Sequence, residues 1–388
     1  MLPLLWLAVA AAAFAMPARV GIVTMQPGTV FFERFGHNAI LIEDAETGMI
    51  TSYNFGFFDP AERDFIRRFL RGEMMYYMVA LPWQQDMQQY QHEGRGATVQ
   101  WLDLTPAQIE TLAELLEDRG LPENARYRYD YFTGNCTTQV RDALNLAMDG
   151  ELQSQLERRT HGATYRSEAI RLARPIPWMW LSFDLGLGPN ADKPLSQWED
   201  AFVPMRLADS LREAHNSEGR PLVKEVQELL PHRLAPEPAE RPRHSWPWLL
   251  IGLGVSAAII AAGRRHPRWL AGLAIPFWLI CGLTGLVLLY LWLMTDHWAA
   301  WSNRNLLLLN PLCLLLLPNA WKASRGHGVD GRFTAALWSI AGIAALAMVF
   351  HWLPLSPQYN SGWIALLLPI HIALAWAFGV ISRTSPPR

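Results

Sequence analysis

Residues 269–295, WLAGLAIPFWLICGLTGLVLLYLWLMT, contain no charged side chain. A run of about 20 apolar residues is long enough to cross the hydrocarbon core of a bilayer as a helix. Four further uncharged runs lie around it, at 246–263, 305–321, 333–354 and 362–382. The C-terminal part of this 388-residue chain is therefore predicted to cross a membrane five times.

The third run differs from the others because it is short and contains Asn310-Pro311 and Pro318. Proline removes a backbone donor and interrupts a helix. Irregular backbone is tolerated at membrane depth only where protein or water covers it. We therefore expect a kinked or re-entrant third span.

Charge divides the chain into two parts. Residues 1–244 hold 24 Lys/Arg against 33 Asp/Glu, whereas residues 245–388 hold 9 against 2. A single soluble domain does not show such a division, and the acidic, water-compatible part would repel phosphate. The composition therefore indicates a membrane protein with an attached polar domain and excludes nucleic acid as a partner.

The basic residues of the loops predict the orientation of the spans. Eight follow the first, third and fifth runs, and only Arg304 lies in the alternate loops; the eight are Arg264, Arg265, Arg268, Lys322, Arg325, Arg332, Arg383 and Arg388. The positive-inside rule then places the tail at 383–388 in the cytoplasm. Because five is an odd number, residues 19–244 lie on the outer face.

The N-terminal segment gives independent support for export. Residues 1–18, MLPLLWLAVAAAAFAMPA, form an apolar run with Ala13-Phe14-Ala15 as a cleavage signature, although the usual basic start is missing. We interpret this run as a signal segment, either removed or kept as an anchor. The expected order is an exported domain at 19–235, a linker at 236–245 and a membrane domain at 246–382.

The exported part shows the patterns of an α+β domain. Strands are predicted at 19–24, 37–42 and 49–55, with a hairpin turn at 44–48. Residues 60–72 form a basic amphipathic helix, which either lies on lipid headgroups or packs on the sheet. The predicted elements that follow are a helix at 105–120, opened by the capping box of Thr105 and Gln108, a strand at 126–132, and a helix from Cys136 to Met148.

Cys136 is the strongest candidate for chemistry. It is alone in the exported part, because Cys281 and Cys313 fall in predicted spans. An unpaired cysteine is a hazard in an oxidising compartment, which suggests that this one has a use. The start of a helix favours the thiolate and offers N–H groups to an oxyanion. We predict a nucleophile; the alternative is a buried inert cysteine.

A thiol nucleophile needs a base, and His37 is the best candidate. Of six histidines in the exported part, only His37 heads a predicted strand, in RFGHNAI at 34–40. A strand can hold the ring against a helix start. The motifs H-E-x-x-H, C-x-x-C, G-x-S-x-G and G-x-x-x-x-G-K-[ST] are absent, so we expect neither a metal nor another cofactor.

These motifs together carry a resemblance. A strand histidine, a hairpin and a cysteine opening a helix resemble the permuted NlpC/P60 (papain-like) arrangement of lecithin-retinol acyltransferase. More specifically, the chain is similar to the Lnb-type bacterial lipoprotein N-acyltransferases in FGHN at 35–38, YNFGFFD at 53–59, YDYF at 129–132, NCTTQVRD at 135–142 and TYR at 164–166, followed by five spans. Where the lecithin-retinol group has a second histidine, this chain has Ser52 or Asn54. These two and Asn135 are candidates to orient the base or to bind the oxyanion.

The resemblance implies an enzyme of the bacterial inner membrane whose catalytic domain lies in the periplasm. Cys136 would take an acyl chain from phospholipid and pass it to the N-terminal amine of a diacylated apolipoprotein. Candidate substrate-binding residues are Tyr129, Arg166, His297, Asn303, Asn305 and Asn310. The last four lie in or beside the loop after the second span. Polar groups at membrane depth are costly and usually have a function. The alternative is that this loop only anchors the protein at the membrane interface through Trp298 and Trp301.

Two other classes of protein fit part of the pattern. One is a membrane-tethered thiol peptidase or amidase of the NlpC/P60 type, or a phospholipase in which water takes the acyl chain. Five spans argue against a peptidase, since a tether needs only one. The other is a non-enzymatic scaffold for lipoproteins, which has no reason to keep a reactive thiol.

Overall fold

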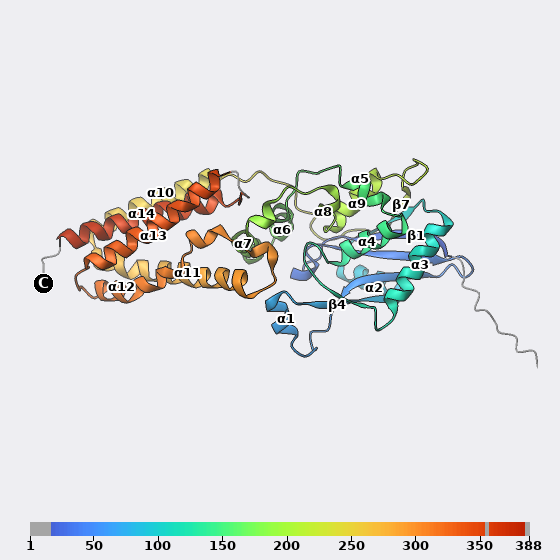
Figure 1. Cartoon of the computed structure of the whole chain (residues 1–388), viewed down its shortest axis with the longest axis horizontal. Coiled ribbons are helices and arrows are strands. Elements are labelled where there is room, and N and C mark those ends of the chain that lie inside the picture. The colour runs from blue at the N-terminus through green and yellow to red at the C-terminus, as the bar shows by residue number, and fades with distance from the viewer. Residues whose placement is uncertain (1–16, 354–356, 385–388) are drawn as a thin grey trace, which may run out of the picture. The chain divides into compact units, whose positions relative to one another are not determined.

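The computed structural model describes residues 17–353 and 357–384 (Figure 1). The predicted signal segment lies almost entirely outside these residues, as does the end of the predicted tail. The chain forms two compact units that alternate along the sequence. The first comprises Met1–Asp59, Met75–His161 and Ser196–Glu237, and the second comprises Pro60–Met74, Gly162–Leu195 and Pro238–Arg388.

The first unit contains a seven-stranded sheet in which all neighbours are antiparallel, in the order β6-β4-β3-β2-β1-β5-β7. Its strands are β1 (Pro17–Met25), β2 (His37–Asp44), β3 (Ile50–Phe57), β4 (Met75–Pro82), β5 (Ala97–Leu102), β6 (Arg126–Arg128) and β7 (Val223–Leu230). The predicted hairpin is confirmed, since β2 and β3 pair with Ala39 opposite Asn54. The Asp44 carboxylate closes its turn by accepting from the Thr47 N–H.

Helices cover both faces of the centre of this sheet. Ile22, Val23 and Met25 of β1 are fully buried, although successive strand residues point to opposite faces. On the face of Val23, Trp83 of α2 packs into the core. The helices and short turns of the unit are η1 (Phe31–Glu33), α2 (Trp83–Glu93), α3 (Pro106–Gly120), α4 (Cys136–Ala147), α5 (Glu151–Leu156), α8 (Gln197–Asp200) and α9 (Pro204–Glu213).

Two helices begin where the sequence predicts. The Thr105 side chain accepts from the Gln108 N–H at the start of α3, and Asn135 does the same for Thr138 at the start of α4. Each side-chain oxygen thus satisfies a backbone donor that the first turn leaves open. Cys136 is consequently the first residue of its helix.

Two predicted elements are shorter than expected. The helix predicted at 60–72 is α1 (Phe65–Arg71), because Asp64 takes a left-handed conformation with φ 63° directly before it. The strand predicted at 126–132 ends at Arg128, because the Asp130 carboxylate accepts from the Phe132 and Thr133 N–H groups and forms a turn. Aspartate favours such local turns over regular structure.

Among the residues that the structure describes, the second unit contains five segments long and apolar enough to cross a membrane, at Trp246–Arg265, Pro267–Met294, Arg304–Ser324, Gly331–Trp352 and Ser361–Ser382. They match the five predicted runs. Four are continuous helices, namely α10 (Trp246–Arg265), α11 (Pro267–Met294), α13 (Gly331–Trp352) and α14 (Ser361–Thr384). Their core includes Trp278 with Phe333 and Phe378 packed around its ring.

The third segment is broken, as predicted. It consists of η4 (Arg304–Leu307), η5 (Pro311–Leu316) and α12 (Leu317–Ser324). The Asn310 side chain accepts from the Leu312 N–H and starts η5. A side chain on Gly285 of α11 would meet the Leu309 carbonyl at 2.2 Å, so glycine allows the two backbones to approach closely.

The same unit includes elements from outside the predicted spans. They are α1, α6 (Tyr165–Ala173), α7 (Pro177–Gly186), η2 (Pro189–Asp192) and η3 (Trp298–Ala300). The Asp296 N–H donates to the Arg71 carbonyl at 2.7 Å, which joins α1 to the loop after α11. Residues between Leu230 and Trp246 form no helix or strand, in keeping with a linker.

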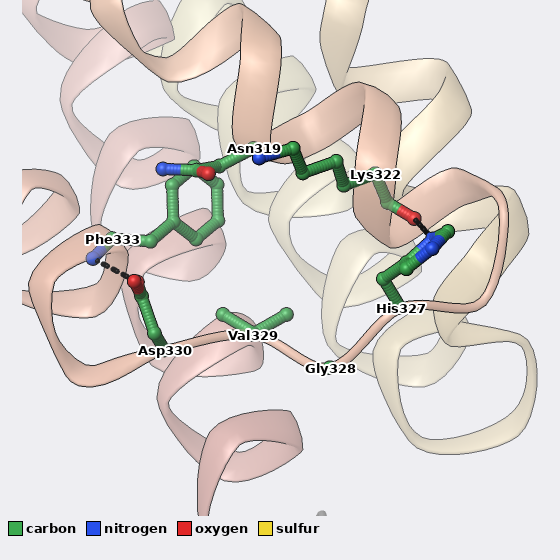
Figure 2. Close-up of a pocket in the computed structure, with 7 residues that line it drawn as sticks. All are labelled: Asn319, Lys322, His327, Gly328, Val329, Asp330 and Phe333. Carbon is green, nitrogen blue, oxygen red and sulfur yellow. Dashed lines mark hydrogen bonds between the residues drawn. The ribbon is translucent and has the colours of Figure 1, made fainter. Parts of the chain in front are cut away.

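A pocket of the second unit lies at the connection between α12 and α13 (Figure 2). Asp330 caps α13 by accepting from the Phe333 N–H, and the ring of His327 bonds to the Lys322 carbonyl. The remaining lining residues are Asn319, Gly328 and Val329. None of the residues predicted for the site lines this pocket, and the hydrogen bonds of Asp330 and His327 lie at helix ends.

Candidate active site

The thiol of Cys136 stands at the N-terminus of α4, held there by Asn135. The Asn135 amide donates to the carbonyls of Tyr131 and Phe202, at 3.0 and 2.9 Å, while its oxygen accepts from Thr138. Both amide hydrogens are therefore used to fix the loop before the helix. Asn135 thus acts as a cap, and it has no donor left for the oxyanion role considered from the sequence.

Polar groups converge on the sulfur of Cys136. The ring of His37 and the backbone N–H of Asn38 both form hydrogen bonds with it, and Thr137 Oγ1 lies 3.8 Å from it. Within the described part of the chain, the backbone N–H groups of Cys136 and Thr137 have no hydrogen-bond acceptor. The first turn thus presents two donors and the positive end of the helix dipole.

His37 reaches the thiol from the first position of β2, where it pairs with Met25 of β1. Its Nε2 lies 3.0 Å from Oδ1 of Asn54, a residue of the adjacent strand β3. The two strands belong to the rigid centre of the sheet. The sequence expectation that a strand would hold the histidine against a helix start agrees with this geometry.

The hydrogen-bond network around Asn54 defines the state of the imidazole. The Asn54 Nδ2 donates to Oδ2 of Asp86 at 2.6 Å and to Oγ of Ser52 at 2.8 Å. A carboxylate only accepts, so the amide nitrogen must face Asp86 and the amide oxygen must face His37. The Nε2 of His37 then carries the hydrogen, which leaves Nδ1 for the thiol.

Asp86 is a member of the site that sequence reasoning missed. It lies on α2 and is 6% exposed, on the same helix face as the buried Trp83 three residues before it. The spacing of three residues between Trp83 and Asp86 places both on one helix face, and this is the sequence signal that could have pointed to Asp86. Ser52, a sequence candidate, lies fully buried behind Asn54 and supports it without facing the histidine.

Electrostatics couple the thiol and the ring. Burial would raise the pKa of the Cys136 thiol, but the charge of His37 and hydrogen bonds from His37, Thr137 and Asn38 outweigh it and hold that pKa below the ordinary range. Burial would likewise lower the pKa of His37, but the charge and hydrogen bond of Cys136 raise it. The pair therefore favours thiolate and imidazolium together.

Tyr129 belongs to a stack of aromatic side chains. Tyr129 stacks on Tyr76 with ring centroids 4.2 Å apart, and Tyr76 stacks on Phe58 at 4.9 Å. Burial, and secondarily the charge of Cys136, raise the pKa of Tyr129, so its hydroxyl stays protonated. Tyr129 is the one substrate-binding candidate in the unit that holds Cys136.

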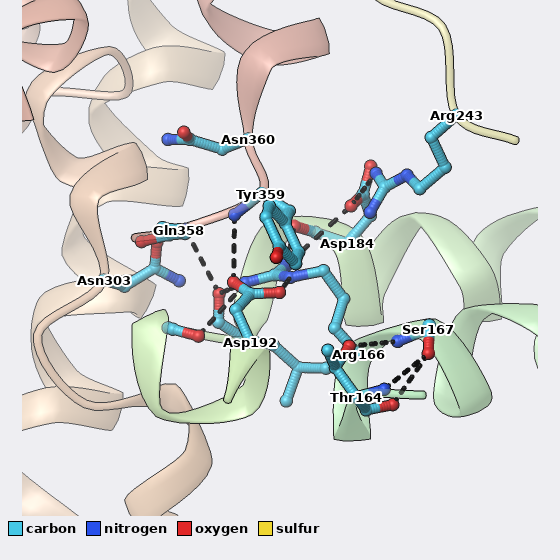
Figure 3. A network of polar contacts seen from close by, with 12 residues as sticks. Thr164, Arg166, Ser167, Asp184, Asp192, Arg243, Asn303, Gln358, Tyr359 and Asn360 are labelled. Atoms are coloured by element: carbon cyan, nitrogen blue, oxygen red, sulfur yellow. Dashed lines mark hydrogen bonds and ion pairs between the residues drawn. The ribbon is translucent and has the colours of Figure 1, made fainter. Parts of the chain in front are cut away.

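The other substrate-binding candidates belong to the second unit and form hydrogen bonds there, and Figure 3 shows two of them, Arg166 and Asn303. Arg166 is 1% exposed; its Nε lies 2.7 Å from Oδ1 of Asp192, and its other nitrogens donate to the carbonyls of Asp184, Leu187 and Gly188. These contacts fix the 184–192 segment. All three guanidinium nitrogens of Arg166 therefore have partners within the unit.

The remaining polar candidates also make internal contacts. Asn303 donates to the Leu185 and Gly186 carbonyls, and Asn305 donates to the Leu185 carbonyl. Gln358 donates to Oδ1 of Asn303, and Asn360 donates to Oδ1 of Asn305. His297 bonds through its ring to the Phe69 carbonyl, and Asn310 caps η5. The cost of polar groups at membrane depth is thus offset by mutual pairing.

Comparison with known proteins assigns both parts of the chain. Residues 10–171 match the Lnb N-terminal periplasmic domain, and residues 241–384 match the Lnb transmembrane domain. No curated protein and no solved structure matches this chain. The two matches follow the order of the predicted exported and membrane parts, and they make this a multi-pass inner-membrane protein with a periplasmic N-terminal domain. The chain therefore belongs to the Lnb-type family of bacterial lipoprotein N-acyltransferases.

Proposed function

We propose that this protein transfers an acyl chain from phospholipid, through a thioester on Cys136, to the N-terminal amine of diacylglyceryl-cysteine apolipoproteins. The observation that carries the proposal is the chain of contacts from Cys136 to His37 to Asn54, in a domain of the Lnb family. A thiol with a base within hydrogen-bond reach, itself oriented by a third group, is the arrangement of an activated nucleophile.

In the first half of the proposed reaction, His37 Nδ1 takes the proton of the thiol. The sulfur attacks the ester carbonyl of the phospholipid, so that an S–C bond forms and the carbonyl electron pair moves to oxygen. The C–O ester bond then breaks. Protonated His37 gives its proton to the departing glycerol oxygen, and lysophospholipid leaves.

In the second half, the free amine of the apolipoprotein attacks the thioester carbonyl. His37 removes a proton from that nitrogen, the C–S bond breaks, and the thiolate of Cys136 is restored while an amide remains on the lipoprotein. His37 thus acts as base and acid in both halves, which is why its Nδ1 must be free to face the reacting atoms. Asn54 would keep it so by accepting from Nε2, with Asp86 holding the Asn54 amide.

The contacts also favour Asn54 as the third residue. In the described part of the chain Ser52 bonds to Asn54 and not to His37, and Asn135 caps a helix. A Cys–His–Asn order in contact, with the histidine before the cysteine in the chain, supports the permuted NlpC/P60 interpretation of this domain. The match to the Lnb domains and the five apolar segments argue for a lipid substrate and against a cell-wall peptide.

Acyl labelling tests this proposal. The full-length protein in vesicles would be incubated with phospholipid that carries a labelled acyl chain, in the absence of an amine acceptor. We expect label on Cys136 that neutral hydroxylamine releases, with an equal yield of lysophospholipid. Adding a diacylated lipopeptide with a free N-terminus should discharge the label as an amide. Cys136→Ala and His37→Ala should each abolish both steps, because the pair acts as a unit.

Cys281→Ala is the matched control, since Cys281 is a buried cysteine of α11, and it should label as the wild type does. Amide formation at the full rate by Cys136→Ala would replace the thioester route with direct transfer. Label that ends as free fatty acid despite the acceptor would make the protein a phospholipase. Cleavage of a peptide with no transfer from lipid would make it a peptidase.

A further inference from the structure

The hydroxyl of Tyr127 is buried without a partner beside the nucleophile. Tyr127 is the middle residue of β6 and is 8% exposed, and its ring packs edge-on against Phe55 with centroids 6.2 Å apart. Within the part of the chain that the structure describes, Tyr127 Oη has no hydrogen-bond partner. A buried unpaired polar group costs about 1–3 kcal/mol, and such groups in native proteins call for an explanation.

Gly56 shows what the hydroxyl faces. A methyl group built on Gly56 would lie 3.5 Å from Cβ of Cys136 and 3.9 Å from Oη of Tyr127. The hydroxyl and the nucleophilic residue therefore border the same small space, which the missing side chain leaves open. Gly56 has φ 101°, a conformation that other residues rarely adopt, so the backbone here also favours glycine.

A second donor lies at the start of α4. The backbone N–H of Cys136 has no acceptor in the described residues, as noted above. When sulfur attacks a carbonyl, negative charge develops on the carbonyl oxygen, and two donors aimed at that oxygen are the usual means of stabilising it. Of the sequence candidates for this task, Asn135 has no free donor. Asn54 is bonded to Ser52, Asp86 and His37, and Ser52 lies behind it.

We propose that Tyr127 is a catalytic residue whose hydroxyl, together with the Cys136 backbone N–H, binds the oxyanion formed when the Cys136 thiolate attacks an acyl carbonyl. The hydroxyl donates a hydrogen bond and keeps its proton, so no bond to Tyr127 forms or breaks. Burial, with the charge of Cys136 as a lesser cause, raises the pKa of Tyr127, which keeps the phenol protonated. This inference deepens the proposed function, since it rests on Cys136 attacking a carbonyl.

Two reagents that use the same thiol separate this role from a structural one. Iodoacetamide alkylates sulfur without forming an oxyanion, whereas p-nitrophenyl butyrate acylates it through one. We expect Tyr127→Phe to lower the rate of acylation of Cys136 about 100-fold, the effect of losing one oxyanion donor. The rate of alkylation should stay within about twofold of the wild type, because the substitution keeps the ring and its packing.

Tyr76→Phe is the matched control. Tyr76 lies directly opposite Tyr127 in the β4–β6 pair and is equally buried, but the charge of Cys136 is not among the causes of its pKa shift. This variant should change neither rate by more than about twofold, well short of the loss expected for an oxyanion donor.

The outcomes distinguish this inference from the proposed function. If Tyr127→Phe lowers both rates equally, the hydroxyl acts on the thiol or on folding, and the inference is wrong. If it changes neither, the oxyanion is bound elsewhere. If Tyr127→Phe lowers the acylation rate but not the alkylation rate, and phospholipid never labels Cys136, the oxyanion role stands. Phospholipid is then not the acyl donor, and the proposed function is wrong. A wild-type thiol inert to the ester would overturn both.

Discussion

At the scale of single residues, the structure makes Cys136 and His37 depend on one another. Neither group would be charged alone in this buried setting, because burial opposes the thiolate and the imidazolium alike. Each charge is stabilised by the other, and further hydrogen bonds from Asn38, Thr137 and Asn54 add to the effect. The charged form of each group is therefore favoured by the charge of the other.

This dependence predicts a change in the pH profile of alkylation. In the wild type, the rate of iodoacetamide reaction at Cys136 should rise with a midpoint below the usual thiol pKa of about 8.5, because the pKa of Cys136 is lowered. In His37→Ala, the largest of the lowering causes is gone and burial remains, so the midpoint should move above that value. Cys136 alkylation is followed by mass spectrometry over a pH series.

His92→Ala serves as the control, since His92 is exposed in the last turn of α2. Its profile should match the wild type. An unchanged midpoint in His37→Ala would mean that the helix start and Asn38 alone set the pKa of Cys136, and the coupling would be refuted.

The sequence was informative about these residues only where the signal was local. Cys136 follows a helix cap and His37 begins a strand, and both facts can be read from neighbouring residues. Asp86 reaches Asn54 across 32 residues, through the packing of α2 on the sheet. Tyr127 matters because Gly56 leaves space beside it. Contacts of this kind depend on tertiary packing, which the spacing of residues in one sequence does not reveal.

At the scale of elements, local signals predicted the starts of α3 and α4 and the β2–β3 hairpin. They failed where an aspartate turn competes with regular structure, at Asp64 and Asp130. They also suggested a substrate-binding role for Arg166, which stays a prediction, because a motif shows which residue is present but not which partners it has. In the structure, α6 uses Arg166 to hold the segment that contains Asp184 and Asp192 (Figure 3).

A structural role for Arg166 predicts a large loss of stability. Arg166→Met removes one partner of a buried ion pair whose side chains are 1% and 0% exposed, which should lower the free energy of unfolding by about 3–5 kcal/mol. Arg212→Met is the control, because the Arg212–Asp209 pair is about half exposed, and its loss should cost about 1 kcal/mol or less. Denaturant unfolding in detergent measures both. Equal stabilities with a raised KM for lipid would instead indicate substrate binding by Arg166.

At the scale of the whole molecule, amino-acid composition predicted the membrane spans. The uncharged runs predicted five spans, and the described part of the chain has five segments of suitable length and hydropathy in the same places. The sequence did not predict that residues 60–74 and 162–195 would join the unit of the membrane helices. A linear division into domains misses this, because it assumes that neighbours in sequence share a core.

The membrane topology depends on the third segment, Arg304–Ser324, because it is broken by two short 3-10 turns and only part of it is α-helical. If it crosses the bilayer, the loops before and after it lie on opposite sides; if it re-enters, they lie on the same side. Ser302 and Gly328 are exposed residues of these two loops, and a side chain on Gly328 meets no other atom within 4 Å. Both positions therefore accept a cysteine.

In a Cys136→Ala background the two remaining cysteines, Cys281 and Cys313, are buried, so a new cysteine should give the only rapid labelling. We expect Ser302→Cys to react with a membrane-impermeant maleimide in intact spheroplasts. Gly328→Cys should react only after permeabilisation, since Lys322, Arg325 and Arg332 predict that its loop is cytoplasmic. Labelling of both from outside would make the third segment re-entrant and leave four crossings. The C-terminus would then lie on the same side as the catalytic domain, and a reporter fused after Arg388 would move from the cytoplasm to the periplasm.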